Sequence, residues 1–146
     1  MFKQINAISC IGASFVMKPF EFDVVVASHL FGDILTDIGG AMMGSIGVAP
    51  AANINVTGDY PSMFEPVHGS APDIVGKNIA NPIGQIWTAK LMLDHFGENR
   101  LGEEILTAIE NATKKDCKTP DIGWECSTRE VTDKICHELI KIRSES

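Results

Sequence analysis

The feature that most constrains the fold is an unbroken apolar run followed directly by an amphipathic segment. Residues 24–27 read VVVA, and a continuous β-branched run is typical of a strand covered on both faces. Ser28 is a favourable helix N-cap residue, and Gly39 and Gly40 are expected to end the following helix. The apolar side of that helix consists of Leu30, Phe31, Ile34, Leu35 and Ile38. We therefore expect an α/β fold with few strands and about four helices.

The remaining sequence alternates turn-rich and helical segments. Residues 1–18 have a weak helical pattern, which Pro19 ends. Residues 41–60 predict a loop with one or two short strands. Residues 61–82 predict a long loop, and such loops inside compact domains are usually functional. A helix is expected after Asn81-Pro82, with an end at Gly97, and another from about Leu101 to Lys114. A last helix is expected after a capping box formed by Ser127 and Glu130. The apolar face of this last helix consists of Val131, Ile135, Leu139 and Ile142.

The composition excludes several classes of partner. The chain has 146 residues, a hydrophobic fraction of 45% and a net charge of −7. An acidic chain is a poor partner for nucleic acid or an anionic membrane surface. No apolar run reaches the length of a membrane span, and no secretory signal precedes the first residues. The cysteines at positions 10, 117, 126 and 136 match no zinc or CxxC pattern, so we interpret them as reduced thiols of a cytoplasmic protein.

Two carboxylates, Asp33 and Asp37, lie four residues apart in the predicted helix after residues 24–27. Like charges at this spacing repel each other by about 0.2–0.5 kcal/mol. One interpretation is that both side chains reach a single Mg²⁺ or Mn²⁺ ion, since such cations prefer carboxylate oxygens. The alternative is two ordinary solvated residues near a helix N-terminus, where negative charge is favoured. Spacing alone favours the second interpretation.

The long loop contains the sequence HGSAPDIVGKNIANP, from His68 to Pro82. Gly69 and Gly76 allow the backbone to approach a ligand closely. The Asp73 carboxylate could accept hydrogen bonds from both ribose hydroxyls of an adenosine and would repel a 2′-phosphate. His68 could stack on a base or contact a phosphate. The pattern is not the GxGxxG fingerprint, and turn chemistry explains the same composition, so a nucleotide site and a surface loop both remain open.

Two long motifs connect these segments to a known family. FDVVVASHLFGDILTDIGGAMMGSIGVAPAANIN and PSMFEPVHGSAPDIVGKNIANPIGQIWTAKLML, in this order, resemble the C-terminal part of the metal-dependent, NAD-linked β-decarboxylating dehydrogenases. This is the isocitrate/isopropylmalate dehydrogenase family, and the greatest resemblance is to its tartrate/D-malate dehydrogenases. It implies a partial fold of that family without the N-terminal half. Residues 1–45 would come approximately from the small, dimerisation domain, and residues 46–146 from the large domain.

The resemblance also implies roles for individual residues. Asp33 and Asp37 match the family's metal-binding aspartates, which hold Mg²⁺ or Mn²⁺. The cofactor NAD would be bound by His68, Gly69, Ser70, Ala71, Pro72, Asp73, Ile74 and Asn81. Asp73 followed by Ile74 matches the NAD-type rather than the NADP-type pattern. The implied substrate is a small 2-hydroxy acid, whose hydroxyl the metal polarises before hydride transfer and loss of CO₂.

Other parts of the family's site have no counterpart in this chain. The family's substrate-binding arginines and its Tyr and Lys acid–base groups precede the matching region, so we assign no catalytic residue. A further metal carboxylate aligns with Ser9, and His29 stands where the family has Asn. We expect either a non-catalytic truncated remnant or a subunit completed by a separate N-terminal chain. Half of the family's sheet would be absent, which leaves apolar surface bare and favours a homodimer.

Overall fold

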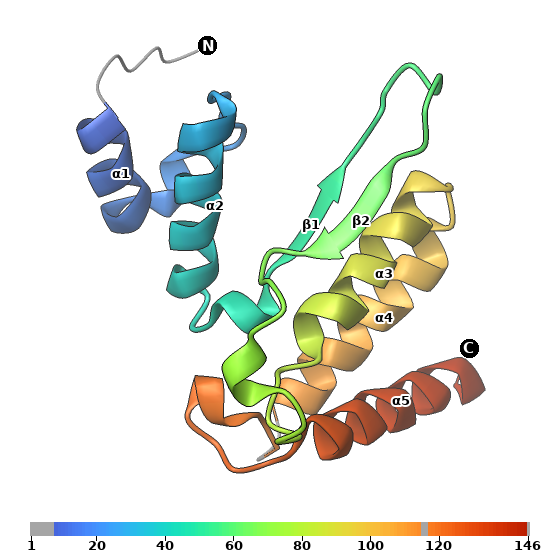
Figure 1. Cartoon of the computed structure of the whole chain (residues 1–146). Helices are drawn as coiled ribbons and strands as arrows, with labels where there is room; N and C mark the ends of the chain where they lie inside the picture. Colours follow the sequence, from blue (N-terminus) through green and yellow to red (C-terminus); the bar gives the residue numbers. More distant parts are fainter. Residues whose placement is uncertain (1–7, 115–116, 146) are drawn as a thin grey trace.

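The computed structural model describes residues 8–114 and 117–145. Within these ranges it has five α-helices and one two-stranded sheet (Figure 1). The elements, in chain order, are α1 (Ile8–Met17), α2 (His29–Met42), β1 (Pro50–Asn53), β2 (Met63–Pro66), α3 (Ile83–His95), α4 (Asn99–Thr113) and α5 (Thr128–Ser144). Single 3-10 turns lie between them at Pro19–Glu21, Ile46–Val48, Pro72–Ile74 and Pro120–Ile122. The expected helix-rich α/β fold is confirmed.

The hydrophobic core lies among α3, α4 and α5. α4 packs against both α3 and α5, and the hairpin of β1 and β2 lies along α3 (Figure 1). The core side chains come from these helices and from the 46–48 turn: Val48, Ile83, Ala108, Ile109, Ala112, Val131 and Ile135. Burial of this apolar surface is the main favourable term in folding. It fixes the start of α3 against both the 46–48 turn and the C-terminal half of the chain.

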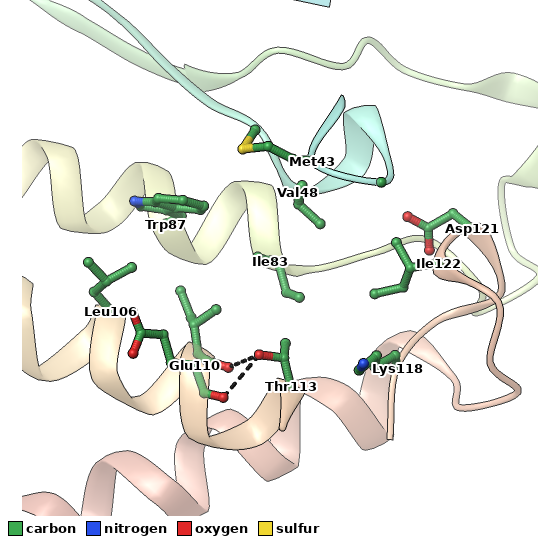
Figure 2. A pocket seen from close by; sticks show the side chains of 12 residues that line it. Met43, Val48, Ile83, Trp87, Leu106, Glu110, Thr113, Lys118, Asp121 and Ile122 are labelled. Carbon is green, nitrogen blue, oxygen red and sulfur yellow. Dashed lines mark hydrogen bonds between the residues drawn. The ribbon is translucent and has the colours of Figure 1, made fainter. Parts of the chain in front are cut away.

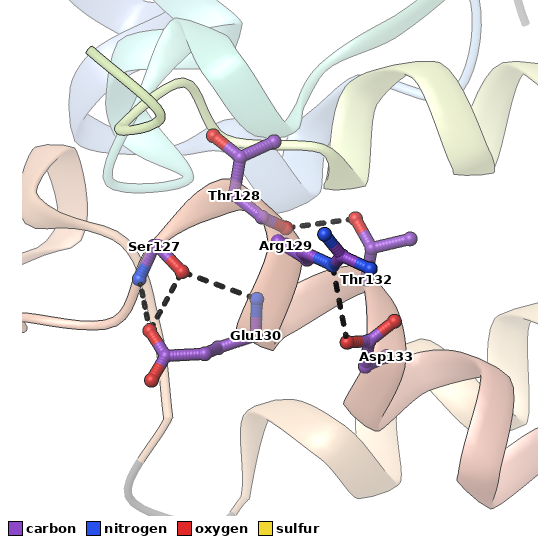
Figure 3. Close-up of polar contacts among 6 residues, drawn as sticks. All are labelled: Ser127, Thr128, Arg129, Glu130, Thr132 and Asp133. Carbon is purple, nitrogen blue, oxygen red and sulfur yellow. Dashed lines mark hydrogen bonds and ion pairs between the residues drawn. The ribbon is translucent and has the colours of Figure 1, made fainter.

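The three C-terminal helices agree with the sequence prediction. Asn81 Oδ1 accepts a hydrogen bond from the Ile83 amide at 3.0 Å at the start of α3. At the start of α5, the Ser127 hydroxyl accepts from the Glu130 amide at 3.2 Å. The Glu130 carboxylate in turn accepts from the Ser127 amide at 2.8 Å (Figure 3). This reciprocal pair is the predicted capping box. Val131 and Ile135 on the predicted apolar face of α5 are buried.

The sheet is an antiparallel hairpin in which Pro50 pairs with Pro66 and Asn53 with Met63. β1 is one of the short strands expected within residues 41–60. β2, in contrast, occupies residues that the sequence analysis assigned to the long loop. This assignment was wrong because MFEP has little strand character on its own, and its conformation comes from pairing with β1 and packing on α3. The Phe64 ring, for example, lies 5.4 Å from that of His95 on α3.

The N-terminal helices α1 and α2 pack against each other, and α2 also contacts the 46–48 turn. The strand predicted for residues 24–27 is not formed: residues 24–28 connect the Pro19–Glu21 turn to α2 without pairing. Val24 is 82% exposed and Val26 is 93% exposed. A strand needs a hydrogen-bonded neighbour, and the described residues offer none beside this segment. The prediction was therefore wrong for this chain.

The predicted helix stop at Gly39 and Gly40 was also wrong, since α2 continues to Met42. Gly40 is buried, and a Cβ built on it would lie 3.4 Å from Ala49 Cβ and from Ile46 Cα. Glycine at this position therefore serves close packing of α2 on the 46–48 turn rather than termination. The chain leaves the helix at Gly44, whose φ of +106° is readily adopted only by glycine. Ser28 is at the N-cap as predicted, but its side chain makes no capping hydrogen bond.

Candidate functional site

The loop from residue 67 to residue 82 connects β2 to α3 and has a defined turn conformation. The Val67 amide donates to the Ala49 carbonyl at 3.0 Å, which fixes the start of the loop to the hairpin. The Pro72–Ile74 turn closes with a hydrogen bond of 3.1 Å from the Ile74 amide to the Ala71 carbonyl. Ala71 has a φ of +42°, and Gly76 has a φ of +76°. The loop is thus an ordered series of turns and not an extended connection.

The end of this loop is fastened to the start of α5. The Thr128 amide donates to the Asn78 carbonyl at 2.9 Å. The Thr128 hydroxyl donates to the Ala80 carbonyl at 2.6 Å. Thr128 lies directly after the capping residue Ser127 (Figure 3). The capping box therefore also holds the residue that orients the loop.

The predicted cofactor residues of this loop are mostly at the surface. Gly69, Ser70, Pro72 and Asp73 are exposed, whereas His68, Ala71 and Ile74 are half-buried. His68 Nδ1 lies 3.0 Å from the Gly69 carbonyl oxygen. No atom lies within 4 Å of a Cβ built on Gly69 or Gly76. The structure thus brings residues 68–74 together along one open stretch of backbone, with the Asp73 carboxylate accessible.

Asn81, the last predicted cofactor residue, has a different environment. It is only 8% exposed. Its side-chain amide donates to Asp121 Oδ2 at 3.0 Å, and its side-chain carbonyl accepts from the Ile83 amide at 3.0 Å. Both ends of the side chain are thus used inside the protein. Asn81 anchors the start of α3 to the Pro120–Ile122 turn.

Asp121 is a site residue that the sequence analysis did not identify. Burial by itself would raise the pKa of its carboxyl, but polar contacts with Ser45, Thr119 and Asn81 outweigh this effect and hold the pKa below its usual value. The buried Thr119 hydroxyl also favours the charged form of the Asp121 carboxyl, although it makes no hydrogen bond of good geometry. A Thr-Pro-Asp turn is visible in the sequence, but nothing there indicates that Asp121 contacts a residue 40 positions away.

Gly47 completes this contact between three segments. A Cβ built on it would lie 2.9 Å from Asn81 Cβ and 3.1 Å from Asp121 Oδ2. A Cβ on Gly84, the second residue of α3, would lie 2.7 Å from the Gly47 carbonyl oxygen. The segments around residues 47, 81 and 121 can approach this closely only because both positions are glycine.

A cavity of about 570 Å³ lies beside the Pro120–Ile122 turn (Figure 2). Ile83, Trp87 and Leu106 are among its apolar lining residues. On its α4 side, the Thr113 hydroxyl donates to the carbonyls of Ile109 and Glu110, at 2.9 and 3.0 Å. None of residues 68–74 lines this cavity. The cavity and the predicted cofactor residues are therefore separate features.

The predicted metal ligands Asp33 and Asp37 are both exposed and lie one turn apart on α2. Asp33 Oδ2 is 3.1 Å from His29 Nε2, and both side chains are largely in solvent. Among residues 8–114 and 117–145, no group of three or more His, Cys, Asp or Glu side chains is arranged to hold a metal ion. Ser9 is part of α1, but its side chain lies outside the described residues. The described residues thus place two exposed carboxylates one turn apart on α2, without the further ligands that a metal centre needs.

None of the helices in the described part of the chain combines the length and the apolar character that crossing a membrane requires.

The sequence is similar to proteins of one known family. Residues 6–135 match the isocitrate/isopropylmalate dehydrogenase family. A probable tartrate dehydrogenase/decarboxylase of Bacillus subtilis is 64% identical over 135 residues, which are 92% of this chain and 38% of that protein. The decarboxylating D-malate dehydrogenase of Escherichia coli is 52% identical over 147 residues, covering 95% of this chain and 39% of that protein. The chain thus spans about two-fifths of the length of these curated relatives.

Solved structures show the same relationship. An isocitrate dehydrogenase from Methylococcus capsulatus superimposes with a TM-score of 0.84 at 36% identity, over 90% of this chain and 39% of that one. A β-decarboxylating dehydrogenase from Thermococcus kodakarensis gives a TM-score of 0.83 at 40% identity, over 94% and 40%. Sequence and structure therefore agree that the chain belongs to the isocitrate/isopropylmalate dehydrogenase family and, within it, resembles the tartrate and D-malate dehydrogenases.

Proposed function

We propose that this chain is the NAD- and metal-binding C-terminal part of an oxidative decarboxylating dehydrogenase for a small 2-hydroxy acid of the tartrate or D-malate type. The observation that carries this proposal is the ordered loop of residues 67–82, with an accessible carboxylate at Asp73 and with both ends fixed to the fold. The names of the relatives at 64% and 52% identity support the same substrate class.

The residues of the loop fit one side of a dinucleotide. The open space beside Gly69 and Gly76 allows a ligand to approach the backbone. Asp73 would accept hydrogen bonds from the ribose hydroxyls and would repel a 2′-phosphate, which favours NAD over NADP. His68, Ser70, Ala71, Pro72 and Ile74 would form the remaining contact surface.

We assign Asn81 a positioning role and not a direct contact with the adenine. Its side-chain amide and carbonyl are both engaged, with Asp121 and with the Ile83 amide. It would therefore hold the end of the loop in place while the backbone around it faces the nucleotide. This modifies the expectation from family resemblance, in which Asn81 is one of the residues that bind NAD.

Asp33 and Asp37 would supply two of the oxygen ligands of Mg²⁺ or Mn²⁺. Two exposed carboxylates one helical turn apart suit a hard cation, but six ligands are needed. The others would come from the substrate, water and a carboxylate of another chain, because Ser9 stands at the matching position here. When bound, NAD⁺ would accept the hydride from the substrate, and the metal ion would polarise its hydroxyl and stabilise the charge left on loss of CO₂.

We further propose that residues 1–45 belong to the small, dimerisation domain and residues 46–146 to the large domain. The pairing of α1 with α2, separate from the core among α3, α4 and α5, supports this division. The exposed apolar side chains of residues 16–34 support a homodimer.

The alternative is a chain with no catalytic activity of its own. A ligand held from one side keeps little of its burial and little of its affinity. The isolated chain should therefore bind NAD weakly and form no NADH. If the chain is a subunit, a separate chain that supplies the acid–base and substrate-binding groups should make the same site active. If it is a non-catalytic remnant, no added chain should do so.

Saturation-transfer NMR with NAD⁺ tests the site, and NADH absorbance with Mn²⁺ and D-malate, tartrate, isopropylmalate or isocitrate tests the activity. We expect weak NAD⁺ binding, and Asp73→Ala should lower the affinity for NAD⁺ about tenfold. Asp59→Ala, at an exposed position of the hairpin loop, is the matched control and should leave binding unchanged. Binding that is insensitive to Asp73→Ala would refute the assignment of the loop. NADH formation by the chain alone would refute the expectation of inactivity.

A further inference from the structure

Cys117 and Cys126 lie at the two ends of the turn-rich connection between α4 and α5. The Cys126 amide donates to the Lys118 carbonyl at 3.0 Å, which pairs the two ends of this connection. Cys117 directly precedes Lys118, so the two cysteines are neighbours across this backbone hydrogen bond, and contact with Cys126 is the main cause of the raised pKa of Cys117. Both side chains are half-buried and pack against the core cluster. Both are nevertheless free thiols, so two cysteines that share no covalent bond lie near each other at the two ends of one short connection.

The two thiols differ in access. Cys126 lines a cavity of about 450 Å³ together with Gly123, Trp124, Glu125 and Glu130. Cys117 is not part of this lining. A small polar molecule can therefore reach Cys126 through this cavity.

We propose that Cys117 and Cys126 form a reversible intramolecular disulfide when the protein meets a hydroperoxide, with Cys126 as the first residue to react. The proposal does not depend on cofactor binding by the loop of residues 67–82. It adds a redox modification to two cysteines for which the proposed function gives no role.

The chemistry proceeds in two displacements. Cys126 loses its proton, and its sulfur attacks one peroxide oxygen. An S–O bond forms and the O–O bond breaks, which leaves Cys126 as a sulfenic acid, and the departing oxygen takes up the proton. Cys117 then loses its proton, and its sulfur attacks the Cys126 sulfur. The S–O bond breaks, and hydroxide leaves and is protonated to water. With hydrogen peroxide, two thiols and one peroxide give one disulfide and two water molecules.

The protonation of Cys117 agrees with this order. Its hydrogen bond with Cys126, together with burial and nearby charge, raises the pKa of Cys117 to about 11. Cys117 is therefore a thiol at neutral pH, and thiols are poor nucleophiles compared with thiolates. Such a group is a resolving cysteine, which reacts only once a sulfenic acid has formed beside it.

The disulfide would act on the connection that carries Asp121. A bond between residues 117 and 126 closes a short loop around the Pro120–Ile122 turn. The turn holds Asn81 at 3.0 Å through Asp121. Oxidation should therefore restrict the contact between this turn and the start of α3, whereas reduction should release it.

The test uses the full chain with the two exposed cysteines replaced, Cys10→Ser with Cys136→Ser. Hydrogen peroxide is added, and free thiols are counted before and after. Peptide mapping without reductant then locates the link. We expect both remaining thiols to disappear, the peptides of Cys117 and Cys126 to be joined with the loss of two hydrogen atoms, and dithiothreitol to restore both thiols. The thermal midpoint of the oxidised protein should rise relative to that of the reduced protein.

The matched control adds Cys117→Ser to the same background. Here Cys126 should stop at the sulfenic acid, detected by dimedone labelling, and the midpoint should not rise. The wild-type chain, mapped in the same way, guards against a folding defect of the variants. Oxidation of Cys126 to sulfinic acid with Cys117 still free, or no reaction at either residue, would overturn the proposal.

Discussion

Gly47 shows how a single residue can hold three segments together. The space for a side chain at this position is already taken by Asn81 and by the Asp121 carboxylate. Glycine there allows the 46–48 turn, the end of the loop of residues 67–82 and the Pro120–Ile122 turn to meet. The residue is thus essential for the geometry around Asn81 although it carries no chemical group.

Gly47→Ala should lower the free energy of unfolding by about 1–3 kcal/mol, because the added methyl group forces Asn81 or Asp121 to move. Urea denaturation followed by circular dichroism measures this. Gly12→Ala is the control, since no atom lies within 4 Å of a Cβ at Gly12 and its helix α1 favours alanine. Equal stability of the Gly47→Ala variant and the wild type would show that the three segments are not closely packed.

Asp121 should make stability depend on pH in the acidic range. Its folded pKa is lowered, despite burial, by polar contacts with Ser45, Thr119 and Asn81. The carboxylate therefore contributes stability above the unfolded pKa of about 3.9, and this is lost as the pH falls through the lower folded value. Asp121→Asn should lower stability at pH 6 and flatten the decline between pH 5 and pH 3. Urea titrations across this range measure it, and Asp59→Asn in the exposed hairpin loop should leave the slope unchanged.

The helices differ in how firmly their starts are fixed. α5 has a complete capping box at Ser127 and Glu130, whereas the Ser28 side chain at the start of α2 makes no capping hydrogen bond. The Ser127 cap also places Thr128, which holds the carbonyls of Asn78 and Ala80. A local capping motif thus stabilises both a helix and the loop that precedes α3.

Ser127→Ala should therefore cost about 1 kcal/mol of unfolding free energy, the usual value for losing an N-cap side chain. Ser28→Ala is the matched control and should cost much less, because no capping hydrogen bond is lost. Denaturant midpoints of the two variants provide the comparison. Equal effects of the two substitutions would show that the capping box adds nothing beyond an ordinary N-cap residue.

Local signals explain which elements could be predicted. The starts of α3 and α5 have Asn-Pro and Ser-x-x-Glu patterns that act within a few residues, and both were predicted. The strand at residues 24–27 was not formed, because a strand depends on neighbours that sequence alone cannot supply. Likewise, Asp33, Asp37 and Asp73 could be named as candidates from motifs, but the Asn81–Asp121 contact joins residues 40 positions apart and has no local signal.

The whole molecule has an uneven distribution of exposed apolar surface. Large apolar side chains at Val16, Met17, Phe20, Val24, Val26 and Leu30 are more than half exposed. The C-terminal helices, in contrast, bury a shared core. Contiguous exposed apolar surface in a folded protein marks an interaction site or an aggregation risk.

We therefore expect the chain to sediment as a dimer at micromolar concentration. Phe20→Asp should shift this equilibrium toward the monomer, because it places a charge in the surface that the dimer would bury. Val56→Asp is the control, since Val56 is 91% exposed in the hairpin loop and away from residues 16–34 in sequence. Analytical ultracentrifugation of the three proteins provides the test. A wild-type chain that is monomeric would contradict the proposed dimer.

Because α2 is attached through the short turn at residues 46–48, a small rotation at this turn moves the far end of the helix. The principal contacts of α2 with the part of the fold that holds the core pass through this turn. From Met42 to Asp33 the helix extends about 14 Å. A rotation of about 10° at the turn therefore displaces Asp33 by about 2 Å, as much as a whole metal–oxygen bond of Mg²⁺. If the proposed metal site is correct, a substitution that tilts α2 at its buried end should change metal affinity without touching either carboxylate.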